Sequence, residues 1–178
     1  VKNNMAGKSD GDIYMECVND AIEVSKYITQ NYKYPLIVYG HSFGSLVTQK
    51  YIQLCHLPKK VVLSGTANGG DAVFGLGKFV ASFISLFGKH HSGKMIEKIS
   101  FGGYEKQFDD KNWLSRDMEV LEKYNADPLC GVSFPISFYK NLFKNLRKLN
   151  KNVKNIAPDT QILIISGDKD PLGRNGKG

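Results

Sequence analysis

Residues 40–44 read Gly-His-Ser-Phe-Gly, which matches the pattern G-x-S-x-G, in which a serine can serve as a nucleophile. The apolar run 36–39 precedes this pattern and helical spacing follows it, so the serine is expected at a sharp turn from strand to helix. Such a turn lifts the Ser42 hydroxyl clear of a sheet, and the first N–H groups of the helix point toward the same place. The pattern therefore predicts Ser42 as the nucleophile and the Phe43 N–H as an oxyanion donor.

The flanking residues follow from the same geometry. Residues two positions away from the serine crowd each other at so sharp a turn, so both Gly40 and Gly44 are predicted to be required. The neighbouring His41 is directed away from the hydroxyl, and a packing or hydrogen-bonding role is predicted for it in place of a role as base. The alternative for the whole motif is an ordinary turn without chemistry.

An acidic residue is expected just beyond a later strand, because a serine at this kind of turn acts in a triad whose acid and histidine follow it along the chain in that order. Residues 166–171 read Ser-Gly-Asp-Lys-Asp-Pro and directly follow the apolar run 161–165. Asp170 is predicted to be the acid, with Asp168 as the second choice. The alternative is that both aspartates merely form a turn before Pro171.

The histidine of the triad is not found in this sequence. His41, His56, His90 and His91 all precede Asp170, and none follows it. The base is therefore expected to lie outside this chain, the chain is expected to be truncated at both ends, and by itself it is expected to be inactive.

The surrounding elements predict an α/β fold. Amphipathic helical spacing covers residues 13–28, with Ser9 or Asp10 available as caps, and helical spacing resumes after Gly44 until Pro58. The runs 36–39, 60–64 and 161–165 resemble strands that are buried on both faces. Alternating helices and strands indicate a parallel sheet.

A long insertion separates the last two strands, far longer than a simple crossover needs. Helical patterns at 76–87, 115–124 and 134–150 predict a helical cap. The predicted architecture is a partial α/β-hydrolase fold, a parallel sheet flanked by helices with an inserted cap. Its divisions are a core segment at 1–65, the cap at 66–155, and the last strand with the acid loop at 156–178.

Composition narrows the function further. The 178 residues are 42% hydrophobic and 23% charged, an ordinary globular balance, and no apolar run is long enough to span a membrane. The three cysteines lack metal-ligand spacing, so reduced, mostly buried thiols in the cytoplasm are expected, and neither a metal nor a cofactor is predicted.

A basic stripe carries much of the net charge of +7. No acidic residue interrupts the segment 140–154, and its stripe consists of Lys140, Lys144, Arg147, Lys148 and Lys151. Such a stripe could touch anionic lipid headgroups, although a solvated face is the alternative. Nucleic-acid binding is not predicted, because no aromatic interleaving accompanies the charge.

Three longer stretches carry a family resemblance: 39–45, Tyr-Gly-His-Ser-Phe-Gly-Ser; 113–117 with 126–131, Trp-Leu-Ser-Arg-Asp and Ala-Asp-Pro-Leu-Cys-Gly; and 164–173 around Asp170. In these stretches the chain resembles the monoglyceride lipase and lysophospholipase-like α/β-hydrolases, a group also labelled serine aminopeptidase-like. The resemblance implies Ser42 as nucleophile, the Phe43 amide in the oxyanion hole and Asp170 as acid. It also implies a carboxylic ester substrate with an apolar acyl group, such as a lysolipid or a monoacylglycerol.

Several alternatives stay open. One set of cap residues has two interpretations, the lining of an acyl-binding slot or simple packing of the cap onto the core: Phe74, Phe79, Phe83, Leu86 and Phe87. A noncatalytic remnant that acts as a binding protein is the second functional hypothesis. A peptidase acting on short N-terminal residues is the third.

Overall fold

The computed structural model describes residues 11–67, 108 and 114–170. The elements in chain order are α1 (Ile13–Asn31), β1 (Ile37–His41), α2 (Phe43–Tyr51), β2 (Lys60–Ser64), α5 (Met118–Ala126), α6 (Ile136–Leu146), the 3₁₀ helix η3 (Leu149–Asn155) and β3 (Gln161–Ile165). The predicted helical pattern at 76–87 and the cap side chains of the acyl slot lie outside the described residues.

The three strands form one parallel sheet in the order β1-β2-β3. Val38 lies opposite Val61, which in turn lies opposite Ile162. The predicted bounds of β2 and β3 are confirmed, while β1 extends into the motif as far as His41. The carboxyl ends of all three strands therefore meet at one edge of the sheet.

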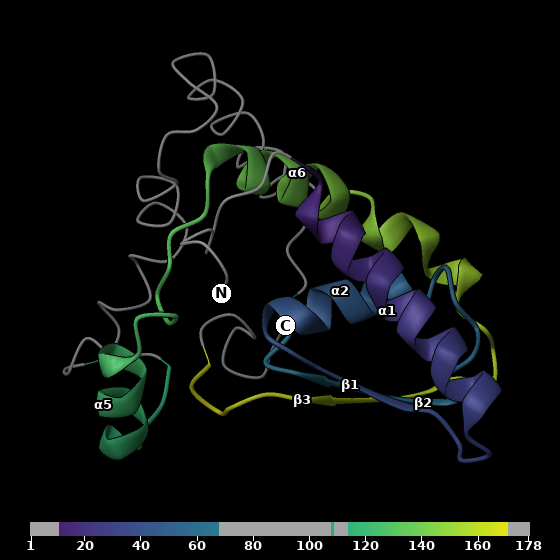
Figure 1. Ribbon diagram of the computed structural model, residues 1–178, viewed down its shortest axis with the longest axis horizontal. Helices are drawn as coiled ribbons and strands as arrows, with labels where there is room; N and C mark the ends of the chain where they lie inside the picture. The colour runs from purple at the N-terminus through teal and green to yellow at the C-terminus, as the bar shows by residue number, and fades with distance from the viewer. Residues whose placement is uncertain (1–10, 68–107, 109–113, 171–178) are drawn as a thin grey trace.

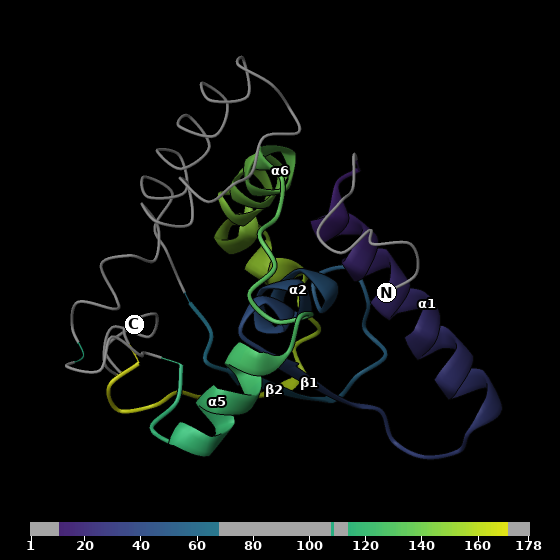
Figure 2. The same cartoon turned by 60° about the vertical axis from the view of Figure 1, so that its left-hand side comes forward.

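Helices α1, α2 and α6 lie on the same side of the sheet (Figures 1 and 2). Their apolar faces share one hydrophobic core with the strands, in which Tyr14, Val18, Tyr51, Val61 and Ile136 are almost completely buried. Tyr14 of α1 also donates a hydrogen bond to the Leu46 carbonyl of α2 at 2.9 Å. Because α6 and Leu149 of η3 belong to this core, the last part of the predicted cap segment packs into the body that supports the sheet.

The cap of α1 differs from the prediction. Asp12, rather than Ser9 or Asp10, caps the helix, since its side chain accepts the Met15 N–H at 3.2 Å. The same carboxylate accepts from Asn145 of α6 at 2.9 Å. Asp12 directly precedes the first helical residue, where a capping oxygen reaches the unpaired N–H groups, and it thereby links α1 to α6.

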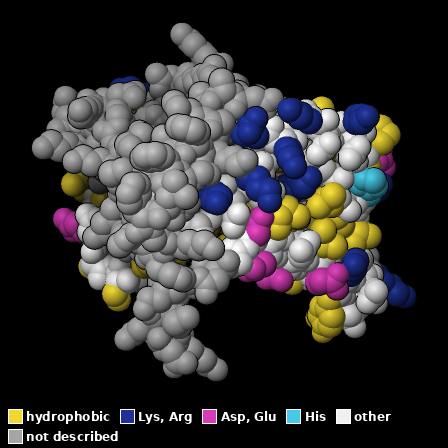
Figure 3. Space-filling model, turned by 90° about the horizontal axis from the view of Figure 1, so that it is seen from above, with side chains coloured by type: hydrophobic (Ala, Val, Ile, Leu, Met, Phe, Trp, Pro, Cys, Tyr) yellow, Lys and Arg dark blue, Asp and Glu magenta, His cyan; other side chains and the backbone are white. Residues whose placement is uncertain are grey.

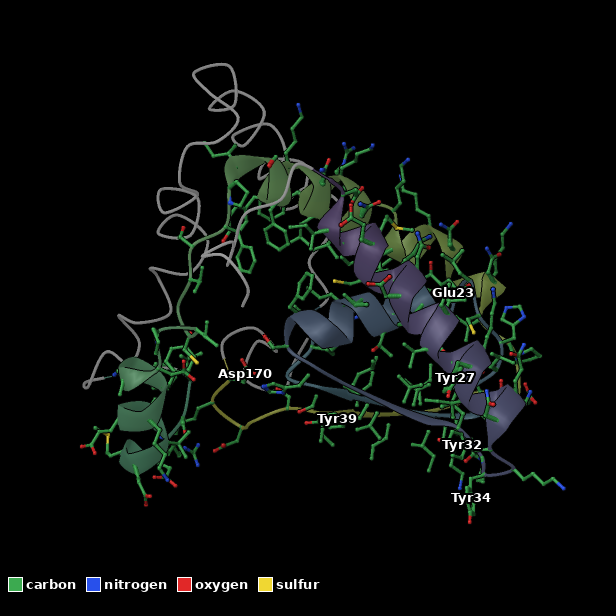
Figure 4. All side chains as sticks on the ribbon, viewed as in Figure 1. Glu23, Tyr27, Tyr32, Tyr34, Tyr39 and Asp170 are labelled. Carbon is green, nitrogen blue, oxygen red and sulfur yellow. The ribbon has the colours of Figure 1, made fainter. Side chains whose placement is uncertain are left out.

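The prediction that all three strands are buried on both faces is wrong within the described residues. Ile37 and Tyr39 of β1 are 58% and 62% exposed, and every residue of β3 is exposed. Successive residues of a strand point to opposite faces of the sheet. Gly40 faces α2, so the Tyr39 side chain lies on the face away from the helices (Figure 4). The described helices cover one face only, so hydrophobicity alone overestimated the burial.

The segment predicted as one helix at 134–150 divides into two. α6 ends at Leu146, and η3 begins at Leu149 with a non-helical residue, Asn152, inside it. The preceding helix α5 begins at Met118, where the Asp117 side chain accepts the Glu119 and Val120 N–H groups. It lies apart from the layer of α1, α2 and α6 (Figures 1 and 2).

None of the described helices combines the length and hydropathy needed to cross a membrane. Cys17, Cys55 and Cys130 are free thiols, as predicted, but only Cys55 is fully buried.

Candidate active site

Ser42 occupies a strained turn between β1 and α2. Its backbone angles are φ 50° and ψ −119°, and among the described residues it is the one non-glycine residue with a positive φ. The turn is fixed by the Ser42 N–H, which donates to the Ser64 carbonyl at the end of β2 at 2.9 Å. Positive φ costs an L-residue on the order of 1–3 kcal/mol, and such strain is characteristic of functional positions.

The two glycines of the motif have different roles. A Cβ atom on Gly40 would lie 2.6 Å from the Gly44 carbonyl oxygen and would also overlap the Thr48 hydroxyl. A Cβ on Gly44 would meet no described atom within 4 Å. The prediction that both glycines are sterically required is therefore confirmed for Gly40 and wrong for Gly44 within the described residues, because only the strand residue is pressed against α2.

Phe43 begins α2, so its N–H belongs to the first turn, where backbone donors have no helical partner. Its ring is held by aromatic contacts, 6.3 Å from the Tyr14 ring and 5.7 Å from the Phe138 ring between centroids. The core thus anchors the residue whose amide lies next to the Ser42 side chain.

His41 makes the kind of contact predicted for it. Its Nδ1 lies 3.1 Å from the Ser64 hydroxyl. His56 lies elsewhere, with Nε2 at 2.8 Å from the Asn155 carbonyl, and His90 and His91 are outside the described residues. In the part of the chain that is described, the Ser42 hydroxyl has no hydrogen-bond partner, so no described imidazole is placed to act on it.

Asp170 lies beyond the carboxyl ends of the strands, at the end of the sheet where α2 begins (Figure 4). Its N–H donates to the Gly167 carbonyl at 3.2 Å, which closes a tight turn after β3. The Ser166 hydroxyl lies 3.4 Å from its Oδ2. Gly65, with φ 54°, sits beside both Asp170 Oδ2 and the His41 ring, so the three strand ends converge here.

Asp168, the second choice for the acid, has a different environment. Its carboxylate forms a 2.6 Å ion pair with Arg116 from the segment before α5. The hydrogen bond and charge of Arg116 hold the pKa of Asp168 below its usual value. This ion pair is exposed, whereas Asp170 Oδ2 lies beside Gly65, directly after the end of β2.

A pocket of about 730 Å³ unites these residues. The predicted Ser42, Asp168 and Asp170 all line it. Its apolar wall includes Phe108, Leu114 and Ile165, and its cations are Arg116 and Lys169.

Sequence reasoning missed several lining residues. Ser64 and Gly65 end β2 at the same edge as Ser42, and the rule that parallel strands present their carboxyl ends together could have identified them. Arg116 lies in the stretch 113–117 that carries the family resemblance, but its ion pair with Asp168 joins residues that are distant in sequence and was not predicted. Among the described residues, no cluster of three or more potential metal ligands occurs.

The fold has clear relatives among solved structures. A lipase in an open form matches 94% of this chain and 57% of its own, with 16% identity and a TM-score of 0.78. A thermostable carboxyl esterase from Bacillus coagulans, in complex with glycerol, matches 96% of this chain and 57% of its own at 22% identity and a TM-score of 0.76. A soluble variant of monoglyceride lipase from Saccharomyces cerevisiae, in complex with a substrate analog, matches 96% of this chain and 56% of its own at 16% identity and a TM-score of 0.65.

The chain thus spans slightly more than half the length of these structures, and the likeness establishes an α/β-hydrolase fold. A search of the curated proteins found no significant match. The model of the serine aminopeptidase S33 family matches residues 6–178. A parallel sheet with a strained serine at the turn into a helix is the arrangement expected of such a match, and the chain belongs to the serine aminopeptidase S33 family of α/β-hydrolases.

Proposed function

We propose that the protein is a serine hydrolase that cleaves carboxylic esters through an acyl-enzyme on Ser42. The observation that carries this proposal is the strained Ser42 turn, which opens into the same pocket as Asp170. A backbone strained by roughly 1–3 kcal/mol persists only where the surrounding fold stabilises it, and such strain clusters at active sites. Strain at a serine that faces a pocket therefore favours a catalytic role for that serine.

In the proposed mechanism, the Ser42 oxygen attacks the ester carbonyl while a histidine base takes its proton. Asp170 orients that imidazole, and the Phe43 N–H donates to the oxyanion of the tetrahedral intermediate. The intermediate collapses, and the alcohol leaves with the proton from the histidine. Water then attacks the acyl-enzyme by the same steps, which releases the carboxylic acid and restores Ser42.

The proposed substrate is a lysolipid. Phe108, Leu114 and Ile165 give the pocket an apolar wall that suits an acyl chain. Lys169 adds a cation, and Arg116 pairs with Asp168 through one guanidinium nitrogen, so its other N–H groups would attract a phosphate in the headgroup. A monoacylglycerol offers the acyl chain without the phosphate and is the closest competitor.

Substrate preference can be tested with the full-length protein. Release of fatty acid is compared between a lysophospholipid and a monoacylglycerol that carry the same acyl chain. We expect the Arg116→Gln variant to lose preference for the lysophospholipid, whereas Lys123→Gln on α5, outside the pocket lining, serves as the control. Equal loss for both substrates in Arg116→Gln would contradict phosphate recognition, and cleavage of aminoacyl amides alone would favour a peptidase.

We also propose peripheral contact with anionic membranes through the basic stripe on α6 and η3. Figure 3 shows Lys and Arg side chains gathered on that face. Lys144, Arg147 and Lys148 are exposed and form no ion pair with any described carboxylate. Their opposite neighbours Tyr139 and Leu146 are buried in the core, which orients the charges outward. The free thiols support a cytoplasmic setting for this contact.

A noncatalytic binding protein is the competing function. It predicts that full-length protein hydrolyses no ester at any rate above that of the Ser42→Ala variant. If the protein is an ester hydrolase, it should turn over esters and lose this activity in Ser42→Ala. Without the nucleophile, only the small residual rate provided by substrate binding and the oxyanion hole remains.

A further inference from the structure

Three polar side chains, which we call the relay, connect α2 and the segment after β2 to the Ser42 backbone: Gln49, Thr66 and Ser45. The Gln49 amide donates to the Thr66 hydroxyl at 2.8 Å. The Thr66 and Ser45 hydroxyls lie 2.8 Å apart, and the Ser45 hydroxyl donates to the Ser42 carbonyl at 2.6 Å. Ser45 is completely buried, whereas Thr66 and Gln49 are half-buried, so the bond between Ser45 and the Ser42 carbonyl starts from a side chain shielded from water.

The direction of each bond follows from donor count. The Ser42 carbonyl cannot donate, so the single hydrogen of the Ser45 hydroxyl lies in the 2.6 Å contact. The Thr66 hydroxyl must then supply the hydrogen between the two hydroxyls. Thr66 in turn accepts from Gln49, and every bond of the relay therefore points toward the Ser42 carbonyl.

The carbonyl of Ser42 and the N–H of Phe43 belong to one peptide group. That group is planar and trans, so its oxygen and its N–H point in opposite directions. A bond that fixes the direction of the Ser42 oxygen also fixes the direction of the Phe43 N–H. The Ser45 and Leu46 N–H groups donate to the same oxygen at 2.9 and 3.4 Å and give this peptide two further restraints.

We propose that Ser45, Thr66 and Gln49 are positioning residues that aim the Phe43 N–H at the oxyanion formed on the substrate. This inference rests on the proposed function of Ser42. Without the relay, the strained peptide loses a side-chain restraint and the donor departs from the position where charge develops. Removing a whole oxyanion donor costs roughly 10²–10³ in kcat, so misdirecting one is expected to cost about 10- to 100-fold.

The test compares Thr66→Val, Thr66→Ser and Ser45→Ala in the full-length protein by ester turnover and by the NMR shift of the Phe43 amide. Thr66→Val keeps the shape of the side chain and removes the hydroxyl, while Thr66→Ser restores it. We expect Thr66→Val and Ser45→Ala to lower kcat with KM nearly unchanged and to shift the Phe43 amide resonance. Thr66→Ser should recover most of kcat.

Ser25→Ala is the matched control. Ser25 is also a buried serine in a helix, and its hydroxyl donates to the Ala21 carbonyl at 2.7 Å and accepts from Tyr51 at 2.7 Å. This variant should lose stability like Ser45→Ala but keep kcat. Equal kcat losses in both variants, or a kcat in Thr66→Val within twofold of the native protein, overturn the relay. If the native protein turns over no ester, the proposed function fails, and an unchanged Phe43 amide resonance in Ser45→Ala then overturns the relay by itself.

Discussion

Gly40 lies directly against the carbonyl group of Gly44, so close that a Cβ atom added to Gly40 would come within 2.6 Å of the Gly44 oxygen. At this contact the end of β1 packs against the first turn of α2, and the sharp turn at Ser42 connects the two. The corresponding position on Gly44 faces no described atom within 4 Å.

The Gly40→Ala variant is therefore expected to be destabilised by about 1–3 kcal/mol or more, because the added methyl group meets backbone that cannot move away easily. Gly44→Ala should keep its stability or gain up to about 1 kcal/mol, since alanine favours a helix over glycine. Urea unfolding of both variants measures the difference. Equal destabilisation would show that the crowding at Gly40 is not what constrains this turn.

The two acid-loop aspartates should differ sharply in catalysis. Asp170→Asn should lower kcat by roughly 10³- to 10⁴-fold, because a neutral amide cannot hold an imidazole in the productive tautomer. Asp168→Asn should retain kcat within about tenfold, because its carboxylate is exposed and paired with Arg116. Steady-state kinetics of both variants decide between them, and the opposite order would make Asp168 the acid.

The buried phenol of Tyr14 is expected to make the protein less stable at alkaline pH. Burial, with the nearby charge of Asp12 as a second cause, raises the pKa of the Tyr14 phenol above its ordinary value. The phenol therefore stays protonated in the folded state at a pH where the unfolded chain ionises. Its contribution is fully present below about pH 10, the unfolded pKa, and is lost progressively as pH rises above it.

The Tyr14→Phe variant checks this assignment. At pH 7 it should cost about 1 kcal/mol, because the hydrogen bond to Leu46 is lost. Above pH 10 the difference from the native protein should shrink, since the variant has no phenol to ionise at this position. Free energies of unfolding measured in urea at several pH values test the expectation, and parallel pH curves would refute it.

The basic stripe predicts salt-sensitive binding to anionic vesicles. Replacing Lys144 and Lys148 with glutamate should abolish sedimentation with phosphatidylglycerol vesicles at low salt, since each basic residue near such a surface contributes about 1 kcal/mol. A matched control replaces Lys33 and Lys123 with glutamate, which changes net charge equally but away from the stripe. If both double variants bind alike, net charge rather than the stripe drives the association.

The strands and the nucleophile turn were predictable because their signals are local. The runs at 60–64 and 161–165 are continuous and bounded by turn residues, and β2 and β3 have these bounds. The change from α6 to η3 was not predictable, because Leu149 continues the apolar spacing of the helix while the backbone tightens to a 3₁₀ helix. Hydrophobicity also failed to show that Leu163 and Ile164 would be exposed.

The contacts that surround Ser42 were beyond sequence reasoning for another reason. The Arg116–Asp168 ion pair and the Ser45–Thr66 contact join residues from separate elements, and nothing in either residue type selects its partner. The convergence of Ser64 and Gly65 with Ser42 follows from parallel strand order, which fixes an edge but no individual bond.

The most direct test is reaction of the full-length protein with a fluorophosphonate probe, followed by mass spectrometry of the labelled peptide. An activated serine reacts, whereas one at ordinary alcohol reactivity does not. We expect one adduct on Ser42, absent from heat-denatured protein and from Ser42→Ala, and slower to form in Asp170→Asn. An unlabelled native protein, or an adduct on Ser64 or Ser115 of the same pocket, would contradict the assignment of Ser42 as the nucleophile.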